Sequence, residues 1–182
     1  AEADDRDHST DIMMPGCWDA LRGKDTFASA KHTTILAGLI EKLIAAKELG
    51  IDRRSIFTAG LSSGATQAMA LGCTRPDLIK GIGVGAGPVI GSSPFEAGKP
   101  SITGAEAAQI CRKLSVGRSG FERQRLSIIV SDNDLIVKPL HSRRTLEAAK
   151  LLYGATDARE LDSRILRGVK KNAVGREYLD PR

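Results

Sequence analysis

The chain has 182 residues, of which 41% are hydrophobic and 27% are charged, a balance that suits one globular domain with a core and excludes a disordered chain. Its net charge of +5 comes with only 4% aromatic residues and mostly scattered basic residues, so a nucleic-acid-binding face is not predicted. No stretch approaches the roughly 20 consecutive apolar residues that a membrane-spanning helix needs.

Hydrophobic periodicity alternates between helix and strand along the chain. It predicts, in order, a helix over 26–49, a strand over 55–59, a helix over about 62–72, a strand over 81–86, a loop over 87–101, a helix over 103–114, a strand over 126–130 and a helix over 141–153. The tail from Gly154 is polar, and its pattern predicts a helix around 157–167. This alternation indicates a single α/β domain over 1–182, with a mostly parallel sheet and helices on both faces. The pattern is weakest over 1–16 and 154–182.

The three cysteines, Cys17, Cys73 and Cys111, show no C-x-x-C spacing, so no zinc or redox site is predicted. Cys73 and Cys111 lie in apolar, helical surroundings, and we expect both to be buried thiols.

The segment TAGLSSGATQAM (58–69) contains the pattern G-x-S-x-G, centred on Ser62. A predicted strand precedes it and a predicted helix follows, which is the context of a nucleophile elbow. In such an elbow Ser62 is the nucleophile, and the backbone N–H of Ser63 faces the developing oxyanion. The alternatives are a glycine-rich turn in which Ser62 caps the helix, or Ser63 as the nucleophile.

A serine nucleophile needs a base, and the base needs an orienting carboxylate. Asp134 is the favoured acid and Asp132 the alternative, because both follow the strand over 126–130. The carboxyl ends of parallel strands share one edge of a sheet, so either carboxylate would lie on the same edge as Ser62. Both residues also suit an ordinary turn.

The general base is harder to assign, because the chain has only three histidines. His8 and His32 precede the serine, whereas the chain order of this architecture is serine, acid, histidine. His141 follows the acid by seven residues and is the remaining candidate base.

Three segments carry a resemblance to a known family: CWDA (17–20), ELGIDRRSIFTAGLSSGATQAMALGCTRPDLIKGIGVGAG (48–87) and LSIIVSDNDLIVKP (126–139). They resemble the polyhydroxybutyrate depolymerase and feruloyl-esterase group of α/β-hydrolases. The likeness covers about 16–153. It implies Ser62 as nucleophile, Asp134 as acid and Ser63 as an oxyanion donor. The family's first strands and its catalytic histidine segment are not evident, so we expect an incomplete, central part of the fold.

The resemblance implies a serine hydrolase that cleaves carboxyl esters through an acyl-enzyme, with no metal or organic cofactor. It implies polyester or aromatic ester substrates, met in an extracellular or periplasmic setting, and neither a nucleic-acid nor a membrane partner. Two alternatives stay open. If Lys138, Arg143 and Arg144 line the cleft, the substrate would be a polyanion such as poly(aspartic acid), with an amide as the scissile bond. The chain could instead be a catalytically inactive, ligand-binding relative.

Overall fold

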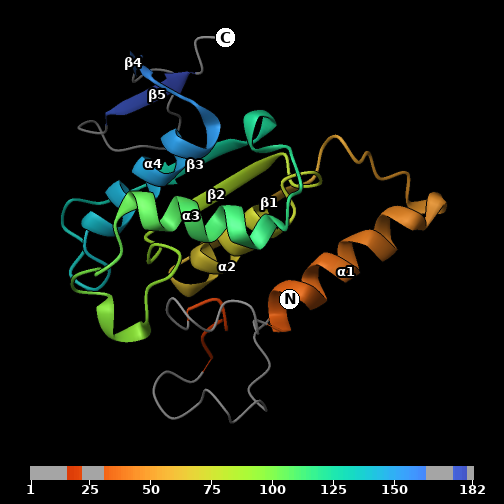
Figure 1. Cartoon of the computed structure of the whole chain (residues 1–182), viewed down its shortest axis with the longest axis horizontal. Helices are drawn as coiled ribbons and strands as arrows, with labels where there is room; N and C mark the ends of the chain where they lie inside the picture. Colours follow the sequence, from red (N-terminus) through yellow and green to blue (C-terminus); the bar gives the residue numbers. More distant parts are fainter. Residues whose placement is uncertain (1–15, 22–30, 163–173, 180–182) are drawn as a thin grey trace.

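The computed structural model describes residues 16–21, 31–162 and 174–179. They form a central sheet with helices packed against it and a separate two-stranded sheet (Figure 1). The elements in chain order are α1 (Lys31–Ala45), η2 (Lys47–Leu49), β1 (Phe57–Leu61), α2 (Ser63–Thr74), β2 (Gly81–Gly85), η3 (Pro94–Glu96), α3 (Gly104–Ser115), η4 (Phe121–Arg123), β3 (Arg125–Ile129), α4 (Leu140–Tyr153), β4 (Asp157–Leu161) and β5 (Gly175–Leu179).

The central sheet contains three parallel strands in the order β1-β2-β3. The register aligns Leu61 of β1 with Gly85 of β2, and Gly85 with Ile129 of β3. Helix α2 connects the first pair of strands and α3 the second, as parallel pairing requires. The predicted α/β fold with a parallel sheet is confirmed. Since the strands run in one direction, the loops that follow them leave from the same edge.

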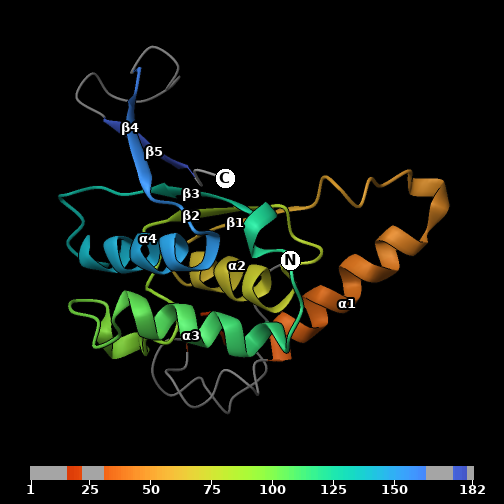
Figure 2. The same ribbon diagram turned by 45° about the horizontal axis from the view of Figure 1, so that its top comes forward.

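Helices α2 and α4 pack against one face of this sheet, and α3 lies beyond them on the same side (Figure 2). The core fills the space between these layers. It contains side chains of α2, the inward-facing residues of β2 and small residues of α3 and α4, among them Ala65, Met69, Ile82, Val84, Ala107 and Ala148. Small side chains on the helices allow this close layering.

The opposite face of the sheet is uncovered within the described part of the chain. Phe57, Leu61 and Ile129 on that face are 68%, 72% and 73% exposed. We call this surface the open sheet face: Phe57, Ala59 and Leu61 of β1, Gly81, Gly83 and Gly85 of β2, and Arg125, Ser127 and Ile129 of β3. The described helices therefore occupy one face, whereas the sequence predicts helices on both.

Helix ends follow local chemistry closely. The hydroxyl of Thr103 accepts the N–H of Glu106, and the carboxylate of Glu106 accepts the N–H of Thr103, so both residues cap α3. Gly154 adopts the left-handed conformation that ends α4. Both helices lie within one residue of their predicted bounds. None of the helices in the described ranges combines the length and apolarity that spanning a membrane requires.

The tail differs from its prediction. Residues 157–161 form strand β4, which pairs in antiparallel fashion with β5, so the helix predicted around 157–167 is wrong for this part. Residue 162 is not helical either, and residues 163–167 lie outside the described part of the chain. The partner strand lies 18 residues further along the chain, and Arg159 of β4 forms an ion pair with Glu177 of β5. Hydrophobic periodicity within a short segment cannot detect a pairing over that separation.

Cys73 of α2 and Cys111 of α3 form a disulfide between the two helices. Both residues are buried, as predicted, but they are not thiols. The pairing was not visible in the sequence because it depends on how two helices cross. Cys17 is the free cysteine among the described residues.

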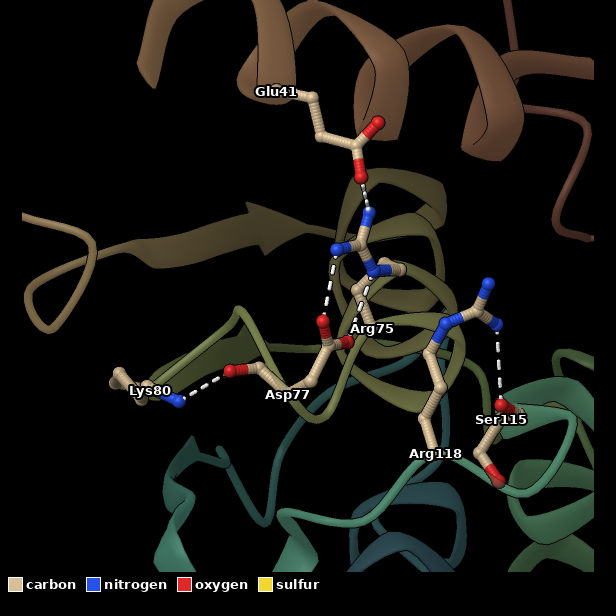
Figure 3. Close-up of polar contacts among 6 residues, drawn as sticks. All are labelled: Glu41, Arg75, Asp77, Lys80, Ser115 and Arg118. Carbon is tan, nitrogen blue, oxygen red and sulfur yellow. Dashed lines mark hydrogen bonds and ion pairs between the residues drawn. The ribbon is translucent and has the colours of Figure 1, made fainter. Parts of the chain in front are cut away.

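Arg75 joins α1 to the end of α2 (Figure 3). Its guanidinium, only 10% exposed, donates two hydrogen bonds of 2.9 Å to the carboxylate of Asp77. It donates a further bond to Glu41 of α1. A buried arginine needs such partners, and here they fix α1 against the body of the fold.

Candidate active site

Ser62 lies between β1 and α2 in a backbone conformation that non-glycine residues rarely adopt, with φ 53° and ψ −126°. Its N–H donates to the carbonyl of Gly85 in β2 (3.0 Å), and its carbonyl accepts from Ala65 (2.9 Å). These bonds hold the strained turn, which costs about 1–3 kcal/mol. Strain of this kind is typical of residues whose side chain has a function.

The hydroxyl of Ser62 does not cap α2, although the residue occupies the N-cap position. The side chain is exposed and has no hydrogen-bond partner among the described residues. The geometry thus disagrees with the alternative in which Ser62 serves as a helix cap. The oxygen is free for another purpose.

The turn depends on a close approach of Gly60 to the first turn of α2. A Cβ at Gly60 would lie 2.0 Å from the carbonyl oxygen of Gly64, so only glycine fits. At Gly64 a Cβ would lie 3.6 Å from Nε1 of Trp18, an ordinary contact. The two glycines of the motif are therefore not equivalent.

The N–H of Ser63 belongs to the first turn of α2, where intrahelical hydrogen bonds leave N–H groups unused. Such groups, together with the helix dipole, favour negative charge in front of the helix. This is the environment that an oxyanion beside Ser62 would need.

Asp134 lies in the loop after β3, at the same edge of the sheet as Ser62. Its N–H donates to the carbonyl of Ser131 (3.1 Å), and its Oδ1 accepts the N–H groups of Ile136 and Val137 (both 2.9 Å). The other carboxylate oxygen has no hydrogen-bond partner in the described ranges. One oxygen is thus anchored, while the second is available to orient a base.

Asp132 differs from Asp134 in this respect. It is exposed, and no hydrogen bond holds its carboxylate within the described residues. A carboxylate in that position is solvated and has no fixed direction, so the geometry favours Asp134 of the two predicted acids.

The end of β2 lies between these two loops. Ala86 has a positive φ of 44°, and its N–H donates to the carbonyl of Ile129 in β3 (3.3 Å). Together with the Ser62–Gly85 bond, this contact links the carboxyl ends of all three strands. Strands β1 and β3, which precede Ser62 and Asp134, lie on either side of β2 and are thus two strand spacings of about 4.8 Å apart.

His141, the candidate base, forms no hydrogen bond with Ser62 or Asp134 through its ring in the described part of the chain. Its side chain is fully buried at the start of α4. Nδ1 accepts the N–H of Val89 (3.0 Å), and Nε2 donates to the carbonyls of Glu96 (2.8 Å) and Ala97 (3.1 Å). Because both ring nitrogens are used by backbone groups, neither is available to take a proton from Ser62. The arrangement opposes the candidate role of His141 as the base.

His32 packs elsewhere, on α1. Its ring lies edge-on to Trp18 with centroids 5.4 Å apart, and its Nδ1 lies 3.4 Å from Oδ1 of Asp19. The indole of Trp18 also borders Gly64, a contact that could not be predicted because the two residues lie far apart in the chain. No hydrogen bond joins His32 to Ser62 in the described part of the chain. His8 lies outside the described residues.

The three predicted substrate-binding cations have different surroundings, and their role stays a prediction. The guanidinium of Arg144 donates to the carboxylate of Glu147 (2.8 Å), which offsets its charge. Arg143 is exposed, and Lys138 is half-buried beside the loop that follows β2. Within the described ranges, no cluster of three His, Cys, Asp or Glu side chains could hold a metal ion.

The parallel sheet with helices packed against it is an α/β-hydrolase fold. The structure of an acetyl xylan esterase from Aspergillus awamori superposes with a TM-score of 0.66 at 20% identity, over 80% of this chain and 58% of that chain. This likeness supports the fold.

The sequence comparison adds a relative. The chain is a distant homologue of a poly(3-hydroxybutyrate) depolymerase from Ralstonia pickettii, with 31% identity over 141 residues. The match includes 76% of this chain and 29% of the depolymerase, so the chain spans less than a third of that protein's length. No protein-family profile matches the chain. The predicted resemblance to this group of α/β-hydrolases is confirmed.

Proposed function

We propose that the chain belongs to a serine hydrolase that cleaves carboxyl esters, either as a polyester depolymerase or as an esterase of the feruloyl-esterase type. The observation that carries this proposal is the strained turn at Ser62, whose hydroxyl is free. The inactive, ligand-binding alternative stays open, because strained backbone also occurs where proteins hold ligands. The homology to a depolymerase and the esterase fold agree with ester cleavage.

In the proposed reaction, Oγ of Ser62 attacks the ester carbonyl carbon, and its proton passes to a general base. The carbonyl oxygen becomes an oxyanion that accepts the N–H of Ser63. The alcohol leaves with the proton, and water then hydrolyses the acyl-enzyme by the same route. The free oxygen of Asp134 would orient the base and stabilise its charged form. No described histidine fits the role of the base, so the proposal does not assign it.

A polyanionic substrate is the alternative within hydrolases. It depends on Lys138, Arg143 and Arg144, and the pairing of Arg144 with Glu147 weakens it. A neutral ester is therefore the favoured substrate. The disulfide is typical of an oxidising compartment and supports the proposed extracellular or periplasmic setting.

The test is covalent labelling of the complete natural protein with a fluorophosphonate, followed by peptide mapping. We expect the label on Ser62, and turnover of an aryl ester should fall by a factor on the order of 10⁴ in Ser62→Ala. Ser63→Ala is the matched control, because its backbone N–H is kept, and it should retain both label and turnover. Label on Ser63, or full activity in Ser62→Ala, would refute the assignment.

A further inference from the structure

His141 is a buried polar residue that the proposed reaction does not use. Its side chain is fully enclosed, and both ring nitrogens are hydrogen-bonded to backbone groups of the loop that follows β2. The N–H of Val89 can only donate, and the carbonyls of Glu96 and Ala97 can only accept. Hence Nδ1 carries no proton, Nε2 carries one, and the ring is neutral.

The loop that receives these bonds is itself fixed. The carboxylate of Glu96 accepts the N–H groups of Ser93 (2.7 Å) and Ser101 (2.9 Å). Burial raises the pKa of Glu96, but hydrogen bonds from Ser101 and Ser93 outweigh that effect and lower it to about 2. At the start of the loop, the hydroxyl of Thr66 in α2 donates to Pro88 (2.8 Å).

The same loop also holds the segment that carries Asp134. The carbonyl of Ala97 accepts the N–H of Lys138 (3.0 Å) as well as Nε2 of His141. The N–H of His141 donates to the carbonyl of Lys138 (3.0 Å). Val137, the preceding residue, is buried and donates its N–H to the carboxylate of Asp134.

A continuous set of contacts therefore runs from the imidazole to the predicted acid. We propose that His141 is a positioning residue: as a neutral imidazole it ties the loop after β2 to the segment 134–138 and so fixes the carboxylate of Asp134 at the sheet edge. Its effect on catalysis rests on the proposed function, whereas its effect on the two loops does not.

Protonation would oppose this role, because an N–H at Nδ1 would face the N–H of Val89. Burial lowers the pKa of His141, although the carbonyls of Glu96 and Ala97 and the charge of Glu96 partly counteract it. On its own helix, the nearby charges of Arg144 and Glu147 pair with each other. The folded-state pKa thus lies below the unfolded value of about 6.5, so this contribution to stability is present above that pH and is lost as the pH falls below it.

The experiment compares His141→Leu with His141→Gln in the complete protein. Leucine removes the hydrogen bonds of both ring nitrogens, while glutamine keeps a donor and an acceptor. Amide hydrogen exchange is measured at Val89, Val137 and Lys138, together with kcat and KM for an aryl ester. We expect faster exchange at all three amides in the leucine variant and a fall of about 10²-fold in kcat with little change in KM. The glutamine variant should recover much of the slow amide exchange and much of the kcat of the wild type.

The outcomes separate the possibilities. If His141→Gln is as inactive as Ser62→Ala, His141 is the general base and the inference is overturned. Unchanged exchange at Val137 and Lys138 in His141→Leu would overturn it equally. If the wild-type protein turns over no ester but the exchange differences appear, the proposed function fails while the positioning role stands.

Discussion

At the scale of single residues, backbone groups fix the positions of Ser62 and Asp134 in different ways. The serine is held in a rare conformation, and its side chain is left without a partner. The aspartate is held through the side chain itself, by two N–H groups on one of its oxygens. Each arrangement leaves one oxygen atom free at the same sheet edge.

These contacts give a test of the acid. Asp134→Asn should keep the fold and strongly reduce kcat, because an amide cannot stabilise a protonated base as a carboxylate does. Asp132→Asn is the matched control, since its carboxylate is solvated, and it should have little effect. Steady-state kinetics on an aryl ester, with circular dichroism as a check of folding, measure both. A larger loss in Asp132→Asn would mean that the acid lies two residues earlier.

The sequence allowed the location of Ser62 and Asp134 at the sheet edge to be predicted, because each location depends on short-range chemistry; their catalytic roles stay predictions. The serine needs a strand, a glycine and a helix in immediate succession, and the acid needs a turn after a strand. His141 could not be understood in this way. Its hydrogen-bond partners lie 44 to 52 residues earlier in the chain, so only the folded structure shows that its ring is fully engaged.

At the scale of elements, an ion-pair network and a disulfide link the helices to one another. Arg75 links α1 to the end of α2, and the disulfide Cys73–Cys111 links α2 to α3. Both lie at the end of α2 that is remote from Ser62. The helix that carries the serine at its start is therefore restrained at its other end.

The Arg75 contact predicts a pH dependence. The hydrogen bonds from Arg75 lower the pKa of Asp77, so the pair contributes stability above the ordinary aspartate pKa of 3.8, and this is lost as the pH falls below it. Asp77→Asn should lower the melting temperature at pH 7, by about 2–4 °C per kcal/mol lost, with a much smaller difference near pH 3. Thermal unfolding at both pH values measures this.

Asp52 provides the control for that experiment. It pairs with Arg54 across the same two-residue spacing but at an exposed site. Asp52→Asn should leave the melting temperature nearly unchanged, because exposed pairs contribute little. Equal changes in melting temperature in the two variants would show that the burial of Arg75 does not strengthen its ion pair with Asp77.

The disulfide predicts a second effect on stability. It closes a loop with a sequence separation of 38 residues, for which the chain-entropy treatment gives about 4 kcal/mol. The double variant Cys73→Ala, Cys111→Ala should lose up to that amount in urea unfolding, and Cys17→Ala should lose none. If the double variant unfolds at the same urea concentration as the wild type, the two cysteines are not paired.

At the scale of the whole molecule, the described layers are uneven: α2, α3 and α4 lie on one side of the sheet, and the open sheet face lies on the other (Figure 2). Parallel sheets normally have both faces covered. The order of strands and helices was predictable, because periodicity reports which element each segment forms. Coverage of the second face was not, because periodicity does not say where an element packs.

The open sheet face should make the 182-residue chain associate with itself, since contiguous exposed apolar surface favours contact between copies. Phe57→Lys places a charge in this face and should lower the weight-average mass in sedimentation velocity. Phe95→Lys is the matched control, because Phe95 is 71% exposed in η3, away from the sheet. Equal reductions in both variants would show that the sheet face has no special part in association.

The contact between Gly60 and Gly64 determines which substitutions evolution can accept at these two positions. A methyl group at position 60 would overlap the backbone of α2, and no side-chain rotation could relieve that overlap. At position 64 the same methyl group would meet only ordinary van der Waals contact. The two glycines are placed symmetrically about the serine in the sequence. Nevertheless, Gly60 tolerates no other residue without a change of backbone, whereas Gly64 can be replaced by alanine. A sequence search that requires glycine at both positions would therefore miss related proteins that keep the geometry of the turn with alanine in place of Gly64.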